Sequence, residues 1–321
     1  MTNIKKNILL LLASIVFSMV IFELSLGIFY SMYPTTTGIC AGKICKSWIN
    51  KNWRVNSLGF RDKDWDFSEP TKRALFIGDS FTAGFGVSEN ERYSNIAASK
   101  NNSGVLIYNA GKNQTDTLDH HRKLKQLTSE IFSPDFVVYQ YFGNDIEYLL
   151  DLNWILKSSI TQKVARYFIT NSFLFDQFLR PFYLTKFTKA YHNTLVASYE
   201  NPETFSKHQK NILEILKHIR KIGAKNVFIV FPMLGSKELF NQTEVLYVKQ
   251  VKQLFTKNCY VGDKLVNIST LIKSIPPDKW TASKFDSHPS PRLHQLIGQT
   301  VADAFDNKKN NHLKPCPRKA N

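Results

Sequence analysis

The stretch Arg73-Ala-Leu-Phe-Ile-Gly-Asp-Ser-Phe-Thr-Ala-Gly-Phe-Gly-Val87 sets the expectation for the whole chain. Its apolar run, Ala74 to Ile77, has the length of a buried strand. Gly78-Asp79-Ser80 then replaces the apolar residues with small and turn-forming ones. A hydroxyl just past the end of a buried strand lies at the edge of an open α/β sheet, where ligands bind. Ser80 is therefore the first candidate for chemistry, although these three residues alone also suit an ordinary turn.

Further apolar segments predict strands that alternate with amphipathic helices. The strands are expected at Val105–Tyr108, Asp135–Phe142, Asn226–Phe231 and Lys264–Ile268, and the helices from Thr117, over Pro202–Lys221 and from Pro291. Asn201 suits the N-cap of the long middle helix, and Gly223 suits its C-terminal stop. Apolar strands that alternate with helices favour a parallel sheet covered on both faces. The expected fold is α/β, a three-layer α/β/α sandwich with a parallel, flavodoxin-like sheet.

One N-terminal segment is long and apolar enough to cross a membrane. Asn7 to Tyr30 contains 24 residues and a single charge, Glu23. At about 1.5 Å per residue such a helix spans a bilayer with some tilt. Lys5 and Lys6 precede it, so the N-terminus is expected in the cytoplasm and the remainder of the chain outside. A cleaved signal peptide is the alternative, but no small-x-small cleavage site precedes Pro34.

Glu23 is unusual within such a helix, because a carboxylate is costly in lipid unless it reaches the interface or finds a partner. Two interpretations stay open. The carboxylate could mark association with another helix, or it could be protonated or extend to the membrane surface.

The charge and the cysteines limit the function classes. The chain has 42 Lys or Arg against 26 Asp or Glu, a formal net charge of +16. No nucleic-acid-binding signature accompanies this charge, so we expect no nucleic-acid partner. The four cysteines form no C-x-x-C pair, which argues against zinc or thioredoxin-like chemistry. Pairing of sequence neighbours gives Cys40–Cys45 and Cys259–Cys316, but three connectivities are possible. An even count agrees with an oxidising, extracytoplasmic compartment.

These patterns divide the chain into several regions. We expect a cytoplasmic N-terminus (1–6), a membrane anchor (7–30), a juxtamembrane segment packed on the main domain (31–71), the main domain (72–306) and a basic C-terminal tail (307–321). An aromatic and basic insertion at about 149–200 interrupts the main domain. It could be a lid or an acceptor-binding surface, or a helical subdomain with its own aromatic core.

Polar or glycine residues follow three of the predicted strands, and a histidine loop precedes the last helix. These positions are Ser80, Gly111, Asn144 and the segment Asp286-Ser-His288. The carboxyl ends of parallel strands converge, so residues far apart in sequence can meet there. A serine needs a base to become a nucleophile, and histidine titrates near neutrality. The N–H groups of Ser80 and Gly111, with the Asn144 amide, would supply donors to an oxyanion.

At this point the sequence resembles the SGNH/GDSL hydrolase superfamily. The matching motifs are Gly78-Asp-Ser-Phe-Thr82, Asn109-Ala-Gly111, Gly143-Asn-Asp145 and His288-Pro289. The lead-in Asn56-Ser-Leu-Gly-Phe-Arg-Asp62, and Tyr199-Glu-Asn-Pro-Glu203 before a helix, are similar to segments of its membrane-anchored bacterial members. The resemblance covers about residues 54–306.

The resemblance implies roles for individual residues. Ser80 would be the nucleophile, His288 the general base and then acid, and Gly111 and Asn144 would complete the oxyanion hole. Asp286 would orient His288, but the commonest pattern places this aspartate three residues before the histidine, where Phe285 stands here. A Ser–His dyad without Asp286 is the alternative. The other seven histidines, including His120 and His121, are interpreted as surface or helix residues.

Together these observations predict a membrane-anchored serine esterase that cleaves an O-acyl ester, in the first instance O-acetyl, of an envelope glycan or lipid through an acyl-enzyme. This chemistry requires no metal and no organic cofactor. The expected partners are an acylated polysaccharide or lipid substrate and the inner membrane, on whose periplasmic side the catalytic domain would lie. Two alternatives stay open: an O-acyltransferase that passes the acyl group to a sugar hydroxyl, and a catalytically silent envelope-binding protein. The sequence does not indicate an oligomeric state.

Overall fold

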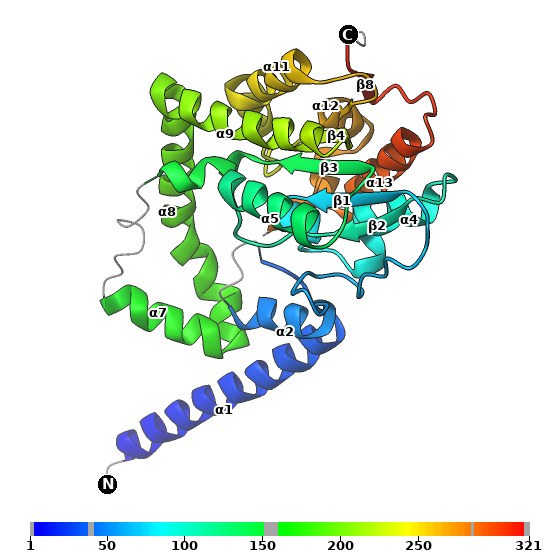
Figure 1. The fold of residues 1–321 in the computed structure, drawn as a ribbon. Helices are drawn as coiled ribbons and strands as arrows, with labels where there is room; N and C mark the ends of the chain where they lie inside the picture. Colours follow the sequence, from blue (N-terminus) through cyan, green and yellow to red (C-terminus); the bar gives the residue numbers. More distant parts are fainter. Residues whose placement is uncertain (1–2, 38–41, 151–159, 284–285, 318–321) are drawn as a thin grey trace. The chain divides into compact units, whose positions relative to one another are not determined.

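The computed structural model describes residues 3–37, 42–150, 160–283 and 286–317 (Figure 1). The chain forms two compact units. The helical unit comprises Met1–Trp53 and Leu152–Tyr191, and the sheet unit comprises Arg54–Asp151 and His192–Asn321. Residues up to Trp53 thus belong to the same unit as the N-terminal helix, whereas the sequence grouped residues 31–71 as a segment packed on the main domain. The division expected from the sequence stays a prediction.

The sheet unit is built on a six-stranded sheet with strand order β2-β1-β3-β4-β5-β8 (Figure 1). The strands are β1 (Arg73–Ile77), β2 (Leu106–Asn109), β3 (Phe136–Tyr141), β4 (Lys225–Val230), β5 (Lys264–Val266) and β8 (Leu313–Pro315). The first five are parallel, and β8 is antiparallel to β5. The order 2-1-3-4-5 is that of flavodoxin-like sheets, so the expected α/β fold is confirmed.

Helices cover both faces of this sheet. Helices α4 (Tyr93–Lys100) and α13 (Pro291–Phe305) pack together on one face, and α5 (Thr117–Glu130), α9 (Pro202–Lys221) and α11 (Lys249–Asn258) lie on the other (Figure 1). Alternate residues of a strand point to opposite faces. Phe76 of β1 accordingly belongs to the core under α13, where Leu293 and Ile297 lie.

The long middle helix shows how local sequence fixes an element. α9 has the predicted bounds, Pro202–Lys221. The Asn201 side chain accepts a hydrogen bond from the Thr204 N–H at 3.0 Å, and the proline at the first position has no N–H to satisfy. Gly223 follows the helix in the left-handed region (φ 77°).

Several elements were not expected from the sequence. A two-stranded antiparallel sheet of β6 (Thr281–Ser283) and β7 (Asp286–Pro289) stands where we expected a loop. Strand β8 lies in the predicted basic tail. The remaining short elements are α3 (Ser80–Ala83), η1 (Glu89–Glu91), η2 (Gly143–Leu149), α10 (Lys237–Thr243), η3 (Glu244–Val248), α12 (Ile268–Leu271), η4 (Ile272–Ser274) and η5 (Pro277–Lys279).

A disulfide joins the last strand region to the sheet unit. Cys259 and Cys316 are bonded, with their Cα atoms 5.8 Å apart, which confirms this half of the expected pairing. The other expected bridge stays a prediction, because Cys40 lies outside the described residues.

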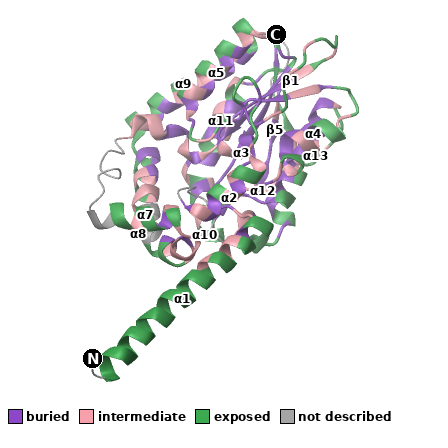
Figure 2. Cartoon of the chain, turned by 90° about the horizontal axis from the view of Figure 1, so that it is seen from below, coloured by how far each residue is buried: buried purple, intermediate pink, exposed green. Residues whose placement is uncertain are grey.

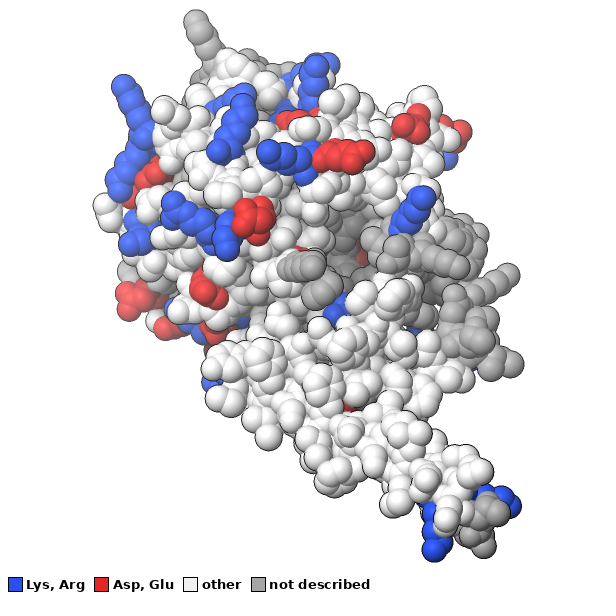
Figure 3. Space-filling model, turned by 180° about the vertical axis from the view of Figure 1, so that it is seen from behind, with Lys and Arg blue, Asp and Glu red and all other residues white. Residues whose placement is uncertain are grey.

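The helical unit contains α1 (Asn3–Met32), α2 (Lys43–Asn52), α7 (Ile160–Asn171) and the first part of α8 (Phe173–Glu200). α1 is long and apolar enough to cross a membrane, and none of its most apolar window is buried within the structure. Figure 2 colours most of this helix as exposed, and Figure 3 shows its surface as largely uncharged with basic side chains at its free end. This agrees with the expected span, since lipid is the environment that suits such a surface.

Two carboxylates organise the helical unit. Glu23 of α1 accepts hydrogen bonds from the Phe173 and Leu174 N–H groups at the start of α8, both at 2.9 Å. It also pairs with Lys43 Nζ at 2.9 Å. Asp176 of α8 accepts the Ile44 N–H of α2 at 2.7 Å. Each carboxylate thus satisfies N–H groups that a helix leaves unpaired at its first turn. Of the two open interpretations of Glu23, the structure supports helix association.

Candidate active site

The turn after β1 presents Ser80. The strand ends at Ile77, and Ser80 is the first residue of the short helix α3. Asp79 is its N-cap: the buried carboxylate accepts the Phe81 N–H at 2.9 Å. The Ser80 N–H belongs to the first helical turn, where N–H groups have no intrahelical acceptor. The serine hydroxyl and this N–H are therefore presented together at the carboxyl end of β1.

The turn is held by β3. Gln140 Oε1 accepts hydrogen bonds from the Asp79 N–H at 3.1 Å and from Thr82 Oγ1 at 2.8 Å. A Cβ atom on Gly78 would lie 2.3 Å from the same Gln140 oxygen and 2.2 Å from Thr82 Oγ1. Position 78 therefore requires glycine, because only a residue without a side chain lets the strand end approach Gln140 this closely.

The structure brings His288 to Ser80. His288 Nε2 lies 2.8 Å from Ser80 Oγ, although the two residues are 208 positions apart. His288 stands on β7, two residues before Ser290, the N-cap of α13. Its ring packs against the rings of Phe81 and Phe85, with centroids 5.2 and 4.8 Å away. The imidazole is thus placed within hydrogen-bond reach of the serine hydroxyl.

Asp286 lies behind the imidazole. Its Oδ1 atom is 2.5 Å from His288 Nδ1 and also accepts the His288 backbone N–H at 3.0 Å. The side chain is only 1% exposed. Residues two apart on a strand point to the same face. Since both residues belong to β7, a carboxylate two positions before the histidine reaches it, which accounts for the departure from the commoner spacing. Phe285 lies outside the described residues.

The surroundings shift the pKa values of two groups in the site. Burial disfavours the charged imidazole, but the Asp286 carboxylate and the more distant Asp79 outweigh it, so the pKa of His288 is raised above its usual value. Burial raises the pKa of Asp79, although the Phe81 N–H and the nearby His288 and Asn144 work against this rise. A histidine of raised pKa beside a carboxylate is suited to take up a proton from a neighbouring hydroxyl.

Gly111 lies against the serine turn, but its N–H has a partner. A Cβ atom at this position would lie 2.3 Å from Ala83 N and 2.5 Å from the Thr82 carbonyl carbon. The Gly111 N–H donates to Asn109 Oδ1 at 2.8 Å. The close approach explains why glycine stands here. Its role in an oxyanion hole stays a prediction, since the N–H would have to be shared with the Asn109 side chain.

Asn144 lies where the sequence predicted it, in the η2 turn that follows β3. Its side-chain oxygen is buried and has no hydrogen-bond partner among the described residues. The amide side chain is close enough to Asp79 to affect the pKa of that carboxyl group. Asn144 therefore lies near the serine turn, as the strand-end argument expected, and its role as an oxyanion donor stays a prediction.

Residues of the lead-in segment support the site, and sequence reasoning assigned them no role. The Arg61 guanidinium is buried and donates to the backbone carbonyls of Ala83, Gly84 and Val87, at the end of α3 and just after it. Asp62 accepts the Asn109 N–H at 2.8 Å. The resemblance of Asn56–Asp62 to a family segment was the available signal, but nothing in the residues themselves pointed to these contacts.

Three of the remaining histidines are more buried than expected. His120, His208 and His294 lie on α5, α9 and α13, and each is fully buried. Burial lowers the pKa of each to about 3, so they are neutral near pH 7. They are helix residues, as expected, but they belong to the interior.

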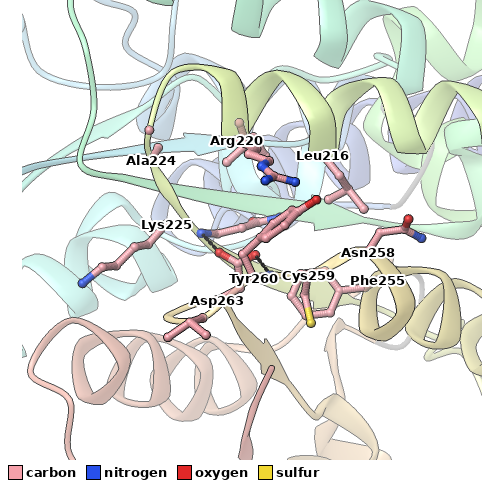
Figure 4. A pocket seen from close by; sticks show the side chains of 13 residues that line it. Leu216, Arg220, Ala224, Lys225, Phe255, Asn258, Cys259, Tyr260 and Asp263 are labelled. Carbon is pink, nitrogen blue, oxygen red and sulfur yellow. Dashed lines mark hydrogen bonds between the residues drawn. The ribbon is translucent and has the colours of Figure 1, made fainter. Parts of the chain in front are cut away.

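A separate pocket of about 310 Å³ opens at the amino end of β4 (Figure 4). Lys225, the first residue of the strand, lines it, and the Arg220 guanidinium lies 3.6 Å from the centre of the Tyr260 ring. Ser80 follows the carboxyl end of β1, and the strands β1, β3 and β4 are parallel. The pocket therefore lies at the amino ends of the strands, whereas Ser80 lies at their carboxyl ends, and the pocket takes no part in the Ser80 site.

Comparisons with known proteins give likeness in structure alone. No protein-family model matches the chain, and no curated protein is similar to it in sequence. Similar solved structures include a lipolytic protein of the G-D-S-L family from Veillonella parvula, with 12% identity, TM-score 0.45, and coverage of 74% of this chain and 99% of that one. Another is the psychrotrophic esterase EstA from Pseudoalteromonas, with 13% identity, TM-score 0.42, and coverage of 74% and 97%.

A third similar structure is LAE5, an alpha/beta hydrolase enzyme from the metagenome of Lake Arreo, with 12% identity, TM-score 0.46, and coverage of 74% and 97%. Identities and TM-scores at this level carry no argument about chemistry, which rests on the arrangement of Ser80, His288 and Asp286.

Proposed function

We propose that this protein is a membrane-anchored serine esterase that acts through an acyl-enzyme. One observation carries the proposal: Ser80 Oγ, His288 and Asp286 form a continuous chain of contacts at 2.8 and 2.5 Å. A nucleophile within reach of a base, and a base oriented by a third group, is the arrangement that activates a serine hydroxyl.

The first half of the reaction follows from these contacts. Ser80 Oγ attacks the carbonyl carbon of the ester while His288 Nε2 takes the hydroxyl proton. Asp286 holds the proton on Nδ1, which leaves Nε2 free as the acceptor, and it stabilises the imidazolium that forms. The oxyanion accepts hydrogen bonds from the Ser80 N–H and the Asn144 amide, with Gly111 as a third donor. The intermediate collapses when His288 returns the proton to the leaving alcohol, and the acyl group stays on Ser80.

The second half repeats these steps with a different nucleophile. Water attacks the acyl-enzyme while His288 removes one of its protons, and collapse of the intermediate releases the carboxylic acid and restores the serine hydroxyl. A sugar hydroxyl in the place of water would make the protein an O-acyltransferase. The same residues serve both outcomes, so the acceptor alone distinguishes them.

The anchor and the disulfide support a place at the cell envelope. If α1 were removed as a signal peptide, the first turn of α8 would lose the Glu23 carboxylate that accepts its N–H groups. We therefore infer that α1 is retained as a membrane anchor. The Cys259–Cys316 bond suits an oxidising compartment, and Lys5 and Lys6 before the helix suit a cytoplasmic N-terminus. We infer a single-pass inner-membrane protein whose sheet unit meets O-acyl esters, O-acetyl groups first, of envelope glycans or lipids on the periplasmic side.

Labelling with a fluorophosphonate tests the enzymatic part. The reagent should modify the wild-type protein on Ser80, and Ser80→Ala should lose all labelling while its melting curve is unchanged. Ser99→Ala, which alters an exposed hydroxyl on α4, is the matched control and should be labelled like the wild type. A folded wild-type protein that stays unlabelled would contradict the proposal and favour a silent envelope-binding protein.

The substrate is tested in cells. Mass analysis of envelope glycans and lipids should show acyl groups accumulating when Ser80→Ala replaces the wild type, because an esterase removes them. Loss of acyl groups in that strain would instead identify a transferase.

A further inference from the structure

The helical unit carries an uncommon set of exposed apolar side chains outside α1. Single exposed apolar residues are normal on a protein surface, but a group on neighbouring helices is a sign of an interaction surface. The group belongs to α7 and to the first turns of α8, and Tyr167 and Phe182 are 66% and 81% exposed. Its members are Val164, Tyr167, Phe168, Phe178, Leu179 and Phe182. We call these six residues the aromatic surface.

Contacts within the helical unit join this surface to α1. The start of α8 is fixed to Glu23, which accepts the Ser172 hydroxyl at 2.7 Å and two backbone N–H groups at 2.9 Å. One turn further along α8, the Phe178 ring lies 6.3 Å from the ring of Phe22. On the other side, Phe168 of α7 packs on Phe175 of α8, with ring centres 4.8 Å apart. The aromatic surface thus continues from the part of α1 around Phe22 and Glu23.

The position of Glu23 along α1 gives the depth of this junction. Glu23 stands seven residues before Tyr30, the end of the expected span. At a rise of about 1.5 Å per residue the junction lies roughly 10 Å inside that end. Amphipathic helices that lie in a membrane surface bury their apolar face to a depth of about 5–10 Å. Helices attached at Glu23 would therefore lie at the boundary between headgroups and acyl chains.

The charge of the helical unit fits anionic headgroups. Its sequence contains eleven Lys or Arg and only two acidic residues, Glu23 and Asp176. Both acids are occupied inside the unit, Glu23 with Lys43 and the start of α8, and Asp176 with Arg180 and the start of α2. Exposed basic side chains stand on α2, α7 and α8, namely Lys46, Lys51, Lys163, Arg166 and Lys189. The outward charge of the described part of this unit is positive.

We propose that α7 and the first turns of α8 form a second membrane contact, which lies in the interfacial region of the bilayer that α1 crosses. Tyr167, Phe178 and Phe182 are buried among lipid there, and Lys163 and Arg166 bind anionic headgroups beside them. The inference rests on the proposed retention of α1 but on no part of the proposed chemistry. It assigns the predicted insertion to the membrane, in place of the lid or the acceptor surface left open by the sequence.

Spin labelling of the full-length protein in vesicles tests this surface. Phe182→Cys and Tyr167→Cys would each receive a nitroxide, in vesicles of phosphatidylcholine with about one third phosphatidylglycerol. Val245→Cys, 74% exposed in the sheet unit, is the matched control. The parent protein, treated in the same way, measures labelling of native cysteines. Oxygen partitions into lipid and a nickel chelate into water, so the ratio of their effects on the spin label reports depth.

We expect the nickel chelate to reach positions 167 and 182 at least about five times less than position 245, with oxygen access raised at both. Equal nickel access at all three positions would overturn the proposal. Low nickel access without raised oxygen access would also overturn the proposal, because a protein partner and not lipid would then cover the two positions. Ser80 labelling in the same vesicles keeps the two proposals apart, since shielded nitroxides on an unreactive protein would contradict only the chemistry.

A double variant tests the proposed binding of anionic headgroups by Lys163 and Arg166. The double change Lys163→Gln with Arg166→Gln should raise nickel access at position 182 about twofold in the anionic vesicles and leave it unchanged in pure phosphatidylcholine. An equal rise in both kinds of vesicle, or no change in the anionic ones, would contradict binding of anionic headgroups by these two side chains.

Discussion

Two buried carboxylates, Asp286 in the sheet unit and Asp176 in the helical unit, have nearly the same surroundings and different consequences. Each is at most 1% exposed, and among the contacts of the described residues each accepts a backbone N–H and lies beside a side-chain nitrogen. The partner of Asp176 is the Arg180 guanidinium at 2.8 Å, and the partner of Asp286 is the His288 imidazole at 2.5 Å. A guanidinium keeps its charge in proteins, whereas an imidazole changes its charge near neutral pH.

The far ends of the two contacts differ as well. Arg180 Nη1 reaches the Thr37 carbonyl oxygen at 3.4 Å, which is an inert backbone group. His288 Nε2 reaches the Ser80 hydroxyl, which can become a nucleophile once its proton is removed. Beside an arginine, a buried carboxylate stabilises the start of a helix. Beside a histidine that contacts a serine, it supports chemistry. If this comparison is correct, changes around Asp286 should act on rate and changes around Asp176 on stability.

The largest effect is expected from His288→Ala. Without the imidazole, no group accepts the Ser80 proton or returns it to the leaving alcohol, so kcat/KM for a chromogenic acetyl ester should fall by about 10⁴-fold or more. The melting temperature should stay near that of the wild type, because the ring is not part of the main core. His121→Ala, which removes a half-buried histidine from α5, should leave the rate unchanged. Normal turnover without His288 would remove it from the site.

Asp286→Asn separates a triad from a dyad. An amide can hold the imidazole in the wrong tautomer and does not stabilise the imidazolium, so kcat should fall by about 10³- to 10⁴-fold. A loss smaller than about tenfold would show that Ser80 and His288 suffice without the carboxylate.

The pH profile of the same variant gives an independent check. Activity needs neutral His288, so in the wild type kcat/KM should rise through the raised pKa of this residue, above its ordinary value of 6.5. Loss of the carboxylate lowers that pKa, and the residual activity of Asp286→Asn should rise at a lower pH than that of the wild type. An unchanged midpoint would show that Asp286 does not interact electrostatically with His288.

The sequence predicted the sheet unit far better than the helical unit, and the reason is physical. Strand ends in a parallel sheet meet at one edge, so Ser80 and His288 could be brought together from periodicity and motif alone. The reach of Asp286 was left open, because the short strand β7 that places it beside His288 carries too little pattern to be recognised. The partners of Arg61 were not predictable, since its acceptors are backbone carbonyls that carry no side-chain signal.

In the helical unit the decisive contacts join residues that no pattern links. Glu23 stood out as a charge in an apolar helix, but the N–H group that it accepts belongs to Phe173, 150 positions away in the sequence. The aromatic and basic composition of the insertion was visible in the sequence, but it suited a lid or acceptor-binding surface as well as a helical subdomain. Composition describes the chemistry of a surface, whereas its partner depends on where the helices are fixed.

Asn144→Ala tests whether the Asn144 amide stabilises the oxyanion next to Ser80. The amide is expected to donate only to the charge that develops in the transition state, so its loss should lower kcat by about 10²- to 10³-fold and change KM little. Asn90→Ala, which changes an exposed side chain of η1, is the control and should retain full activity. If KM rose while kcat was retained, Asn144 would bind substrate in its ground state and would not stabilise the oxyanion.

The smallest effect, and the one that most directly contrasts the two carboxylates, is expected from Asp176→Asn. The amide oxygen can still accept the Ile44 N–H, but Arg180 loses its charged partner inside the unit, at a cost of about 2 kcal/mol. The open form of the helical unit should be about 30-fold more populated, and limited proteolysis of vesicle-bound protein should cleave α7 and α8 faster by that factor. Glu203→Gln, which removes an exposed carboxylate paired with Lys207, should change neither cleavage nor activity. Ser80 should react with fluorophosphonate at the wild-type rate in Asp176→Asn, because that carboxylate contacts no group that moves a proton. If Asp176→Asn also lowered the reactivity of Ser80, Asp176 would affect the chemistry as well as the stability, and its contrast with Asp286 would fail.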